Sequence, residues 1–167
     1  MPKSQFGLEA RPGTYALLLS SATDARIRVG RLGDMCLQSG FYIYVGSAFG
    51  PGGVRARVTH HLHATPRPHW HIDFLRPHAS VEEVWLYHGR KQREHLWARL
   101  LSSQPGVSVP IPGFGSSDCG CEAHLFFFKT KALRDRVFDS LSAQGASRRV
   151  LTLIIPRGPM NATRCRW

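Results

Sequence analysis

The chain has 167 residues, a length that fits one domain able to bury about 68–70% of its unfolded surface around a single core. Lys and Arg total 22 against 11 Asp and Glu, which gives a formal net charge of +11. This charge favours a polyanionic partner, nucleic acid first, although presequences, ribosomal proteins and membrane-surface proteins are also basic.

The apolar pattern and the cysteines favour a cytoplasmic protein. The longest apolar runs, such as Ala16–Leu19 and Leu125–Phe128, fall far short of the roughly 20 residues of a membrane span. The residues before Tyr15 lack the apolar core of a secretory signal. The four cysteines are too few and too unevenly spaced for a disulfide framework, so we expect reduced thiols.

Three strands are predicted in the first part of the chain. They cover Thr14–Leu19, Arg26–Leu32, where polar and apolar residues alternate, and Phe41–Val45, which is β-branched and aromatic. Because the connections are short, we expect these strands to form an antiparallel meander.

A turn over Phe49–Gly53 leads into the first predicted helix. Val54, Val58 and Leu62 recur every four residues, which predicts a helix over this stretch. Two further strands are expected next, over residues 70–75 and 81–87, with a turn at Pro77 between them.

The second half of the chain contains two predicted helices, over Lys91–Ser102 and Ala132–Leu141. A Pro/Gly/Ser-rich loop over Ser103–Cys121 separates them and is long enough to be functional or pinned. Strands are expected at Leu125–Phe128 and Val150–Ile155.

These elements predict an α/β fold of the α+β type, in which a small antiparallel sheet is flanked by helices and extended by C-terminal strands and a helix. The domain is expected to span residues 13–156, and residues 157–167 to form a basic, mobile tail.

Two tripeptides carry a family resemblance. Gly13-Thr14-Tyr15 lies on the first predicted strand and Tyr44-Val45-Gly46 on the third. Alone, either tyrosine is most simply a core or rim aromatic. Together the tripeptides resemble the signature of the GIY-YIG nuclease superfamily, with Thr14 and Val45 in place of its isoleucines.

Arg57 and His61 lie one helical turn apart on the helix that follows the second tripeptide. The superfamily places an arginine there, and an Arg-then-His pair together with Ser47 resembles its homing-endonuclease branch. A solvated helix face is the alternative interpretation. Because each residue precedes a core position, we expect both at the rim of the core.

Glu94 is the only acidic residue in the predicted helix over residues 91–102. The resemblance implies a glutamate on a later helix as the metal ligand, and Glu94 matches it. The alternative is that Glu94 pairs with a neighbouring arginine. The superfamily also uses a later asparagine, whereas the only asparagine here is Asn161 in the tail, so either Asp118 or Ser117 substitutes for it or catalysis is compromised.

Two further segments, over residues 69–73 and 113–125, resemble an uncharacterised GIY-YIG subfamily that occurs alone or fused to a base-excision glycosylase. Cys119, Cys121 and His124 in the second segment suit a structural zinc ion by residue type, with His69 or His71 as a fourth ligand. The Cys-x-Cys spacing departs from the usual knuckle, and buried thiols with Asp118 capping the turn are the alternative.

The resemblance implies a metal-dependent endonuclease that hydrolyses phosphodiester bonds, in DNA more than in RNA and plausibly in repair. It implies that Tyr15 or Tyr44 helps deprotonate the attacking water, that Arg57 holds the non-bridging oxygens and that His61 relays a proton. Glu94 would bind Mg²⁺ or Mn²⁺ on the leaving-group side.

Contacts to nucleic acid are expected from residues that flank this site: Ser47, Arg55, Arg67, Arg90 and Lys91. Two other functions fit the sequence. One is a non-catalytic nucleic-acid-binding module with the same fold, favoured by the missing asparagine and the high charge. The other is a zinc-stabilised protein-interaction domain.

Overall fold

The computed structural model describes residues 6–151. Its centre is a five-stranded sheet in the order β6-β4-β1-β5-β7, and every neighbouring pair is antiparallel. The strands are β1 (Gly13–Ser21), β4 (Gly40–Ala48), β5 (Ser80–His88), β6 (Leu125–Phe128) and β7 (Ser147–Val150).

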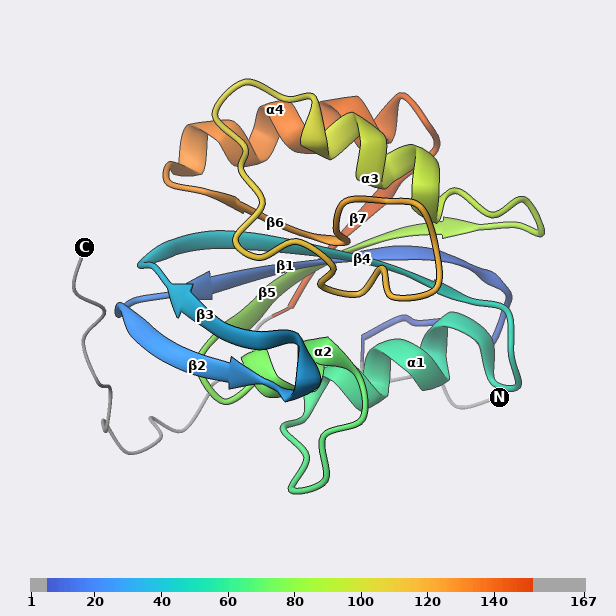
Figure 1. The fold of residues 1–167 in the computed structure, drawn as a ribbon. Coiled ribbons are helices and arrows are strands. Elements are labelled where there is room, and N and C mark those ends of the chain that lie inside the picture. Colours follow the sequence, from blue (N-terminus) through green and yellow to red (C-terminus); the bar gives the residue numbers. More distant parts are fainter. Residues whose placement is uncertain (1–5, 152–167) are drawn as a thin grey trace.

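Two layers cover this sheet (Figure 1). On one face lie the helices α1 and α2 together with the hairpin of β2 and β3, and on the other face lie α3 and α4. Their bounds are β2 (Ala25–Val29), β3 (Gly33–Leu37), α1 (Gly53–Leu62), α2 (His71–Leu75), α3 (Glu94–Ser102) and α4 (Lys131–Ser142). The α+β class predicted from the sequence is confirmed.

The two faces of the sheet carry separate hydrophobic clusters. Along β1, Tyr15 and Leu17 belong to the cluster under α1, whereas Ala16 and Leu18 belong to the cluster under α3 and α4. All four side chains are buried, because alternate residues of a strand point to opposite faces. None of the helices in the described part of the chain combines the length and apolar character that a bilayer span demands.

The predicted meander of the first three strands is wrong. β1 pairs directly with β4, from Gly13 opposite Ala48 to Ser21 opposite Gly40. β2 and β3 form a separate two-stranded sheet, and β3 was not predicted. The reason lies in burial: β1 is apolar on both faces and takes the centre of the sheet, whereas exposed Arg26 alternates with buried Ile27 in β2, which covers one face.

The predicted strand over residues 70–75 is also wrong, because this stretch forms α2. Asp73 Oδ2 accepts hydrogen bonds from the backbone N–H groups of His69 and Trp70, and these contacts hold the first helical turn. The helix predicted from Lys91 begins at Glu94. β7 overlaps the last predicted strand, Val150–Ile155, at Val150, and residues 152–155 of that prediction lie outside the described residues, as does the tail over residues 157–167.

Candidate active site

The two signature tyrosines lie on the face of the sheet that α1 covers. The Tyr15 hydroxyl is hydrogen-bonded to His61 Nε2 at 2.9 Å, across 46 residues of sequence. The Tyr44 ring meets the His61 ring edge-on, with 5.9 Å between the ring centroids. The fold therefore brings both tyrosines and His61 into one cluster.

The glycines of the two tripeptides have a steric role in this cluster. Gly46 lies directly opposite Tyr15 in the ladder, and a Cβ on Gly46 would come within 2.4 Å of the Tyr15 hydroxyl oxygen. A Cβ on Gly13 would come within 2.2 Å of the Tyr87 carbonyl oxygen. Neither position has room for a side chain, so Gly46 allows the close approach of the Tyr15 ring and Gly13 that of the Tyr87 backbone.

Replacing Gly46 with Ala is therefore expected to lower the free energy of unfolding by about 1–3 kcal/mol, because the buried Tyr15 ring must move. Gly50→Ala is the matched control, since nothing lies within 4 Å of a Cβ at that exposed position. Chemical denaturation of both variants measures the difference. Equal stabilities would show that the Tyr15 ring is not held against Gly46.

Burial sets the protonation of this cluster. It raises the pKa of Tyr15 and of Tyr44 well above the ordinary phenol value, and the positive charge of Arg57 opposes that rise only in part. Burial also lowers the pKa of His61, which is fully buried instead of lying at the rim as the sequence predicts. The tyrosines and His61 are thus all neutral near pH 7, and neutral His61 can accept a proton.

The carboxylate of Asp73 lies close to the rings of His61 and His60. Its Oδ1 is 3.7 Å from His61 Nδ1 and 3.3 Å from His60 Nε2, while its Oδ2 caps α2. Burial alone would raise the pKa of Asp73, but the His61 ring and the backbone N–H donors outweigh it and lower the pKa. Asp73 is therefore ionised and lies beside His61 Nδ1, which makes no aligned hydrogen bond; we refer to Tyr15, His61 and Asp73 together as the polar chain.

Sequence reasoning missed Asp73. The sequence predicts a strand over residues 70–75, whereas residues 71–75 form α2, which directs the Asp73 carboxylate toward His61. The one available signal was an acidic residue three positions after a potential helix start at Trp70, the place where a carboxylate caps backbone donors.

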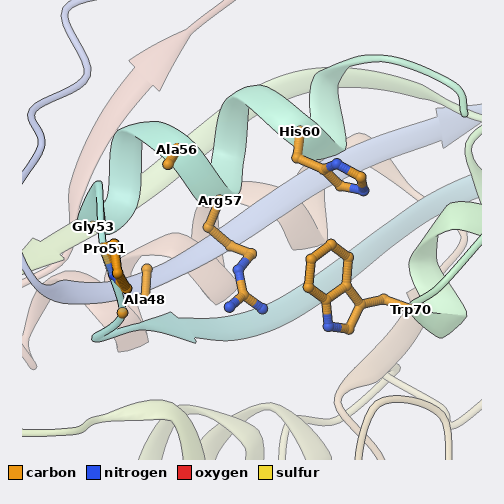
Figure 2. A pocket seen from close by; sticks show the side chains of 8 residues that line it. Ala48, Pro51, Gly53, Ala56, Arg57, His60 and Trp70 are labelled. Atoms are coloured by element: carbon orange, nitrogen blue, oxygen red, sulfur yellow. The ribbon is translucent and has the colours of Figure 1, made fainter.

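Arg57 lines a pocket beside α1 (Figure 2). Its side chain extends from α1 with Ala48 on one side and Trp70 on the other, and its guanidinium carbon lies 4.4 Å from the centroid of the Trp70 ring. The pocket holds about 180 Å³, and His60 also lines it. Arg57 is half-buried, and its guanidinium stacks on the Trp70 ring while its charge can still reach an anion bound in the pocket.

Glu94 lies at the first turn of α3, on the far side of β4 from His61. Its Oε2 accepts hydrogen bonds from Ser47 Oγ at 2.8 Å and from Gln92 Nε2 at 3.2 Å. Its Oε1 lies 3.2 Å from His124 Nδ1. Burial opposes ionisation of Glu94, but His124 and Ser47 outweigh burial and lower its pKa, so the carboxylate is charged.

The surroundings of Glu94 fit a divalent ion. Mg²⁺ commonly binds through one or two carboxylates and fills its other positions with water. Glu94 supplies an ionised carboxylate with one oxygen oriented by Ser47 and Gln92, and the other oxygen faces His124 Nδ1 at 3.2 Å without an aligned hydrogen bond. The structure gives Glu94 an imidazole neighbour, His124, where the alternative interpretation expected an arginine partner.

The residues expected to contact nucleic acid differ in how exposed their side chains are. Arg67, Arg90 and Lys91 are exposed, and Arg55 is half-buried on α1. The loop that carries Arg90 and Lys91 lies beside the start of β1, because the Arg93 N–H donates to Thr14 Oγ1 at 3.1 Å. The Ser47 hydroxyl is engaged with Glu94 in the structure.

Asp118 and Ser117, the candidates to replace the missing asparagine, are both exposed in the long loop after α3. The negative charge of Asp118 contributes to the raised pKa of Tyr44, so Asp118 lies within electrostatic reach of the cluster. Cys119 and Cys121 in the same loop are half-buried, which departs from the buried thiols of the alternative interpretation.

A family model described as "Domain of unknown function DUF123" matches residues 14–145. The matched stretch runs from β1 to the end of α4 and contains every side chain discussed above as part of the site. The comparisons with curated proteins and with solved structures give no match.

Proposed function

The chain belongs to the DUF123 family, and we propose that it is a divalent-metal-dependent endonuclease that hydrolyses phosphodiester bonds in nucleic acid, DNA more than RNA. The observation that carries this proposal is the buried hydrogen bond between Tyr15 and neutral His61, with Tyr44 against the same ring. These are residues to which the GIY-YIG resemblance assigns catalysis. The resemblance adds a role in DNA repair to this proposal, and the apolar pattern and the cysteines of the sequence add a cytoplasmic location.

The polar chain supplies a route for the proton of the attacking water. As the water oxygen bonds to phosphorus, the water proton passes to the Tyr15 oxygen and the Tyr15 proton passes to His61 Nε2. The negative charge of Asp73, near His61 Nδ1, stabilises the imidazolium that forms. This relay needs no tyrosinate at rest, which agrees with the raised pKa of Tyr15.

The remaining groups act on the phosphate. Arg57 neutralises charge on the non-bridging oxygens as the bond to the leaving oxygen breaks, and the leaving oxygen takes a proton from solvent. Glu94 would hold Mg²⁺ or Mn²⁺, which stabilises the developing charge on that leaving oxygen. Ser47 and Gln92 hold the Glu94 carboxylate in place.

The second candidate function is a non-catalytic nucleic-acid-binding module. The observation that favours it is the burial of the two tyrosines, of which Tyr15 is 1% and Tyr44 6% exposed. A hydroxyl that water does not reach cannot activate water. The missing asparagine points the same way, because Asn161 is the only one in the chain and lies outside the described residues.

A cleavage panel separates these functions. Single-stranded, duplex and branched DNA, and the corresponding RNAs, are incubated with the full chain in Mg²⁺, in Mn²⁺ and with a chelator. The nuclease proposal expects a metal-dependent cut in at least one DNA. Binding without any cut in the whole panel would instead establish the binding module.

Affinity for nucleic acid is expected to fall steeply with salt, with a log–log slope steeper than about −2, because each phosphate contact contributes about −0.9 in duplex DNA. Arg90→Ala should reduce the slope by about one contact. Arg136→Ala, at an exposed residue of α4 outside the candidate site, should leave it unchanged. A flat salt response, or equal slopes in both variants, would remove Arg90 from the binding surface.

A further inference from the structure

Four side chains of the zinc-ligand type meet between α3 and the long loop that follows it. They are His95 from α3 and Cys119, Cys121 and His124 from the loop, and one ligand atom of each lies within 4.8 Å of the other three. Two thiols and two imidazoles in this arrangement match the donor set of closed, four-coordinate structural zinc sites. The cysteines were singled out in the sequence, but the fourth donor is His95 and not His69 or His71.

His71, one of the two histidines expected as fourth ligand, is committed elsewhere. Its Nδ1 accepts a hydrogen bond from the Gly115 N–H at 2.9 Å. His69 lies in the exposed segment before α2 and is stacked edge-on against Trp70. His95 follows Glu94 directly in α3, and its ring lies beside that of His124 with 5.8 Å between the centroids.

The distance between Cys119 Sγ and His124 Nε2 agrees with the geometry of a tetrahedral zinc site. Cys119 Sγ lies 3.5 Å from His124 Nε2. A tetrahedral zinc ion with Zn–S near 2.3 Å and Zn–N near 2.05 Å separates its sulfur and nitrogen ligands by about 3.5–3.6 Å. A thiol–imidazole hydrogen bond would have a similar length, but it would involve only two of the four side chains whose ligand atoms lie within 4.8 Å of one another.

The loop that provides three of the ligands has little regular secondary structure. Residues 103–124 contain no helix and no strand of the main sheet. The loop is attached to the rest of the chain by the backbone pair of Ser108 with Phe127, by the bond from Val45 N–H to the His124 carbonyl and by the bond from Gly115 N–H to His71 Nδ1. Loops of this length in compact domains need pinning. A hollow of about 310 Å³ beside His95 and Cys121 gives an ion a path to the cluster.

His124 links this cluster to Glu94. Its Nε2 faces Cys119 and its Nδ1 lies 3.2 Å from Glu94 Oε1. A zinc-bound histidine commonly directs its second ring nitrogen at a carboxylate, which fixes the ring and the carboxylate together. His124 Nδ1 is buried and has no aligned hydrogen-bond partner among the described residues. A zinc ion that fixed the ring would hold this nitrogen toward the Glu94 carboxylate.

We propose that His95, Cys119, Cys121 and His124 bind one zinc ion, which pins residues 103–124 onto α3 and holds His124 against Glu94. The positioning of Glu94 rests on the proposed nuclease function, whereas zinc binding does not. Binding displaces the two thiol protons to solvent, because cysteine ligates zinc as the thiolate.

Elemental analysis of the full chain tests the site. The chain is produced with zinc in the growth medium and purified under reducing conditions, and it should retain about one zinc ion per chain. Cys119→Ser and Cys121→Ser should each lower the content below about 0.2. Cys36→Ser is the matched control, because Cys36 is an exposed cysteine of β3 outside the cluster, and it should keep the full content.

Cobalt substitution of the unaltered chain keeps the test decisive if the serine variants do not fold. Co²⁺ in this site should show thiolate-to-cobalt charge transfer and the absorption of a tetrahedral ion. Glu94→Gln should keep the zinc, which separates this site from the proposed catalytic metal. A zinc-free chain without the cobalt spectrum, or serine variants with undiminished zinc, would overturn the inference.

The two proposals fail separately. A chain that holds zinc but cuts no nucleic acid would retain the zinc site and remove the nuclease function. A chain that cuts in Mg²⁺ but takes up neither zinc nor cobalt would do the reverse.

Discussion

Glu94→Gln is expected to reduce metal-dependent cleavage by at least about 100-fold, because the amide keeps the shape of the side chain but loses the charge that holds the ion. The amide oxygen can still accept the Ser47 and Gln92 hydrogen bonds, so the fold should survive. Affinity for DNA should hold or rise, since a negative charge is removed near the phosphate. Initial rates at saturating metal and a separate binding titration measure the two effects.

Glu122→Gln is the control for this substitution. Glu122 is an exposed glutamate in the loop before β6, so the same loss of charge should leave cleavage within about 2-fold. If Glu94→Gln keeps full activity, Glu94 is not the metal ligand, and Asp118 becomes the next carboxylate to replace.

Tyr15→Phe is expected to lower cleavage by about 10²-fold to 10⁴-fold, the range of a lost general acid–base group, because phenylalanine cannot pass a proton to His61. The ring volume is nearly unchanged. The free energy of unfolding should fall by about 1–3 kcal/mol, since His61 Nε2 loses its partner in a buried position.

Tyr42→Phe separates this chemical effect from the loss of stability. Tyr42 lies two residues before Tyr44 on β4, and its hydroxyl is also hydrogen-bonded, to the N–H and the carbonyl of Gln38 at 2.7 and 2.9 Å. Its loss should cost a similar free energy of unfolding and leave cleavage unchanged. Equal cleavage by Tyr15→Phe and Tyr42→Phe would reduce Tyr15 to a core aromatic and favour the binding module.

Tyr44→Phe completes the set. The Tyr44 ring meets the His61 ring edge-on, but only Tyr15 is hydrogen-bonded to His61, so the relay through Tyr15 predicts a smaller loss of cleavage for Tyr44→Phe than for Tyr15→Phe. Parallel rate measurements on the two variants decide which tyrosine passes the proton.

Much of the fold could be predicted from the sequence because local patterns determine it. The every-fourth-residue repeat of Val54, Val58 and Leu62 predicted α1, and all three residues are buried against the sheet. The α+β fold class was predicted correctly because it also follows from local helix and strand patterns. The order of the strands was not, because short connections favour neighbouring strands while burial of β1 on both faces placed β4 and β5 beside it.

The candidate site was only partly predictable. The tripeptides and the Arg57–His61 spacing named side chains that lie on or near one face of the sheet, since these positions follow from strand and helix periods. Asp73 and His95 were missed, because each acts through a contact between segments that no local pattern encodes. The degree of burial was missed too: the contact of the Trp70 ring, at the start of α2, with His61 depends on tertiary packing.

The most direct test of the nuclease proposal is cleavage of branched and supercoiled DNA by the unaltered chain in Mg²⁺ or Mn²⁺, beside Glu94→Gln and Tyr15→Phe chains purified identically. The account predicts that the unaltered chain cuts, that a chelator stops the reaction, and that both variants fall by at least about 100-fold. Cleavage at the same rate by all three preparations, or by none of them, would contradict it.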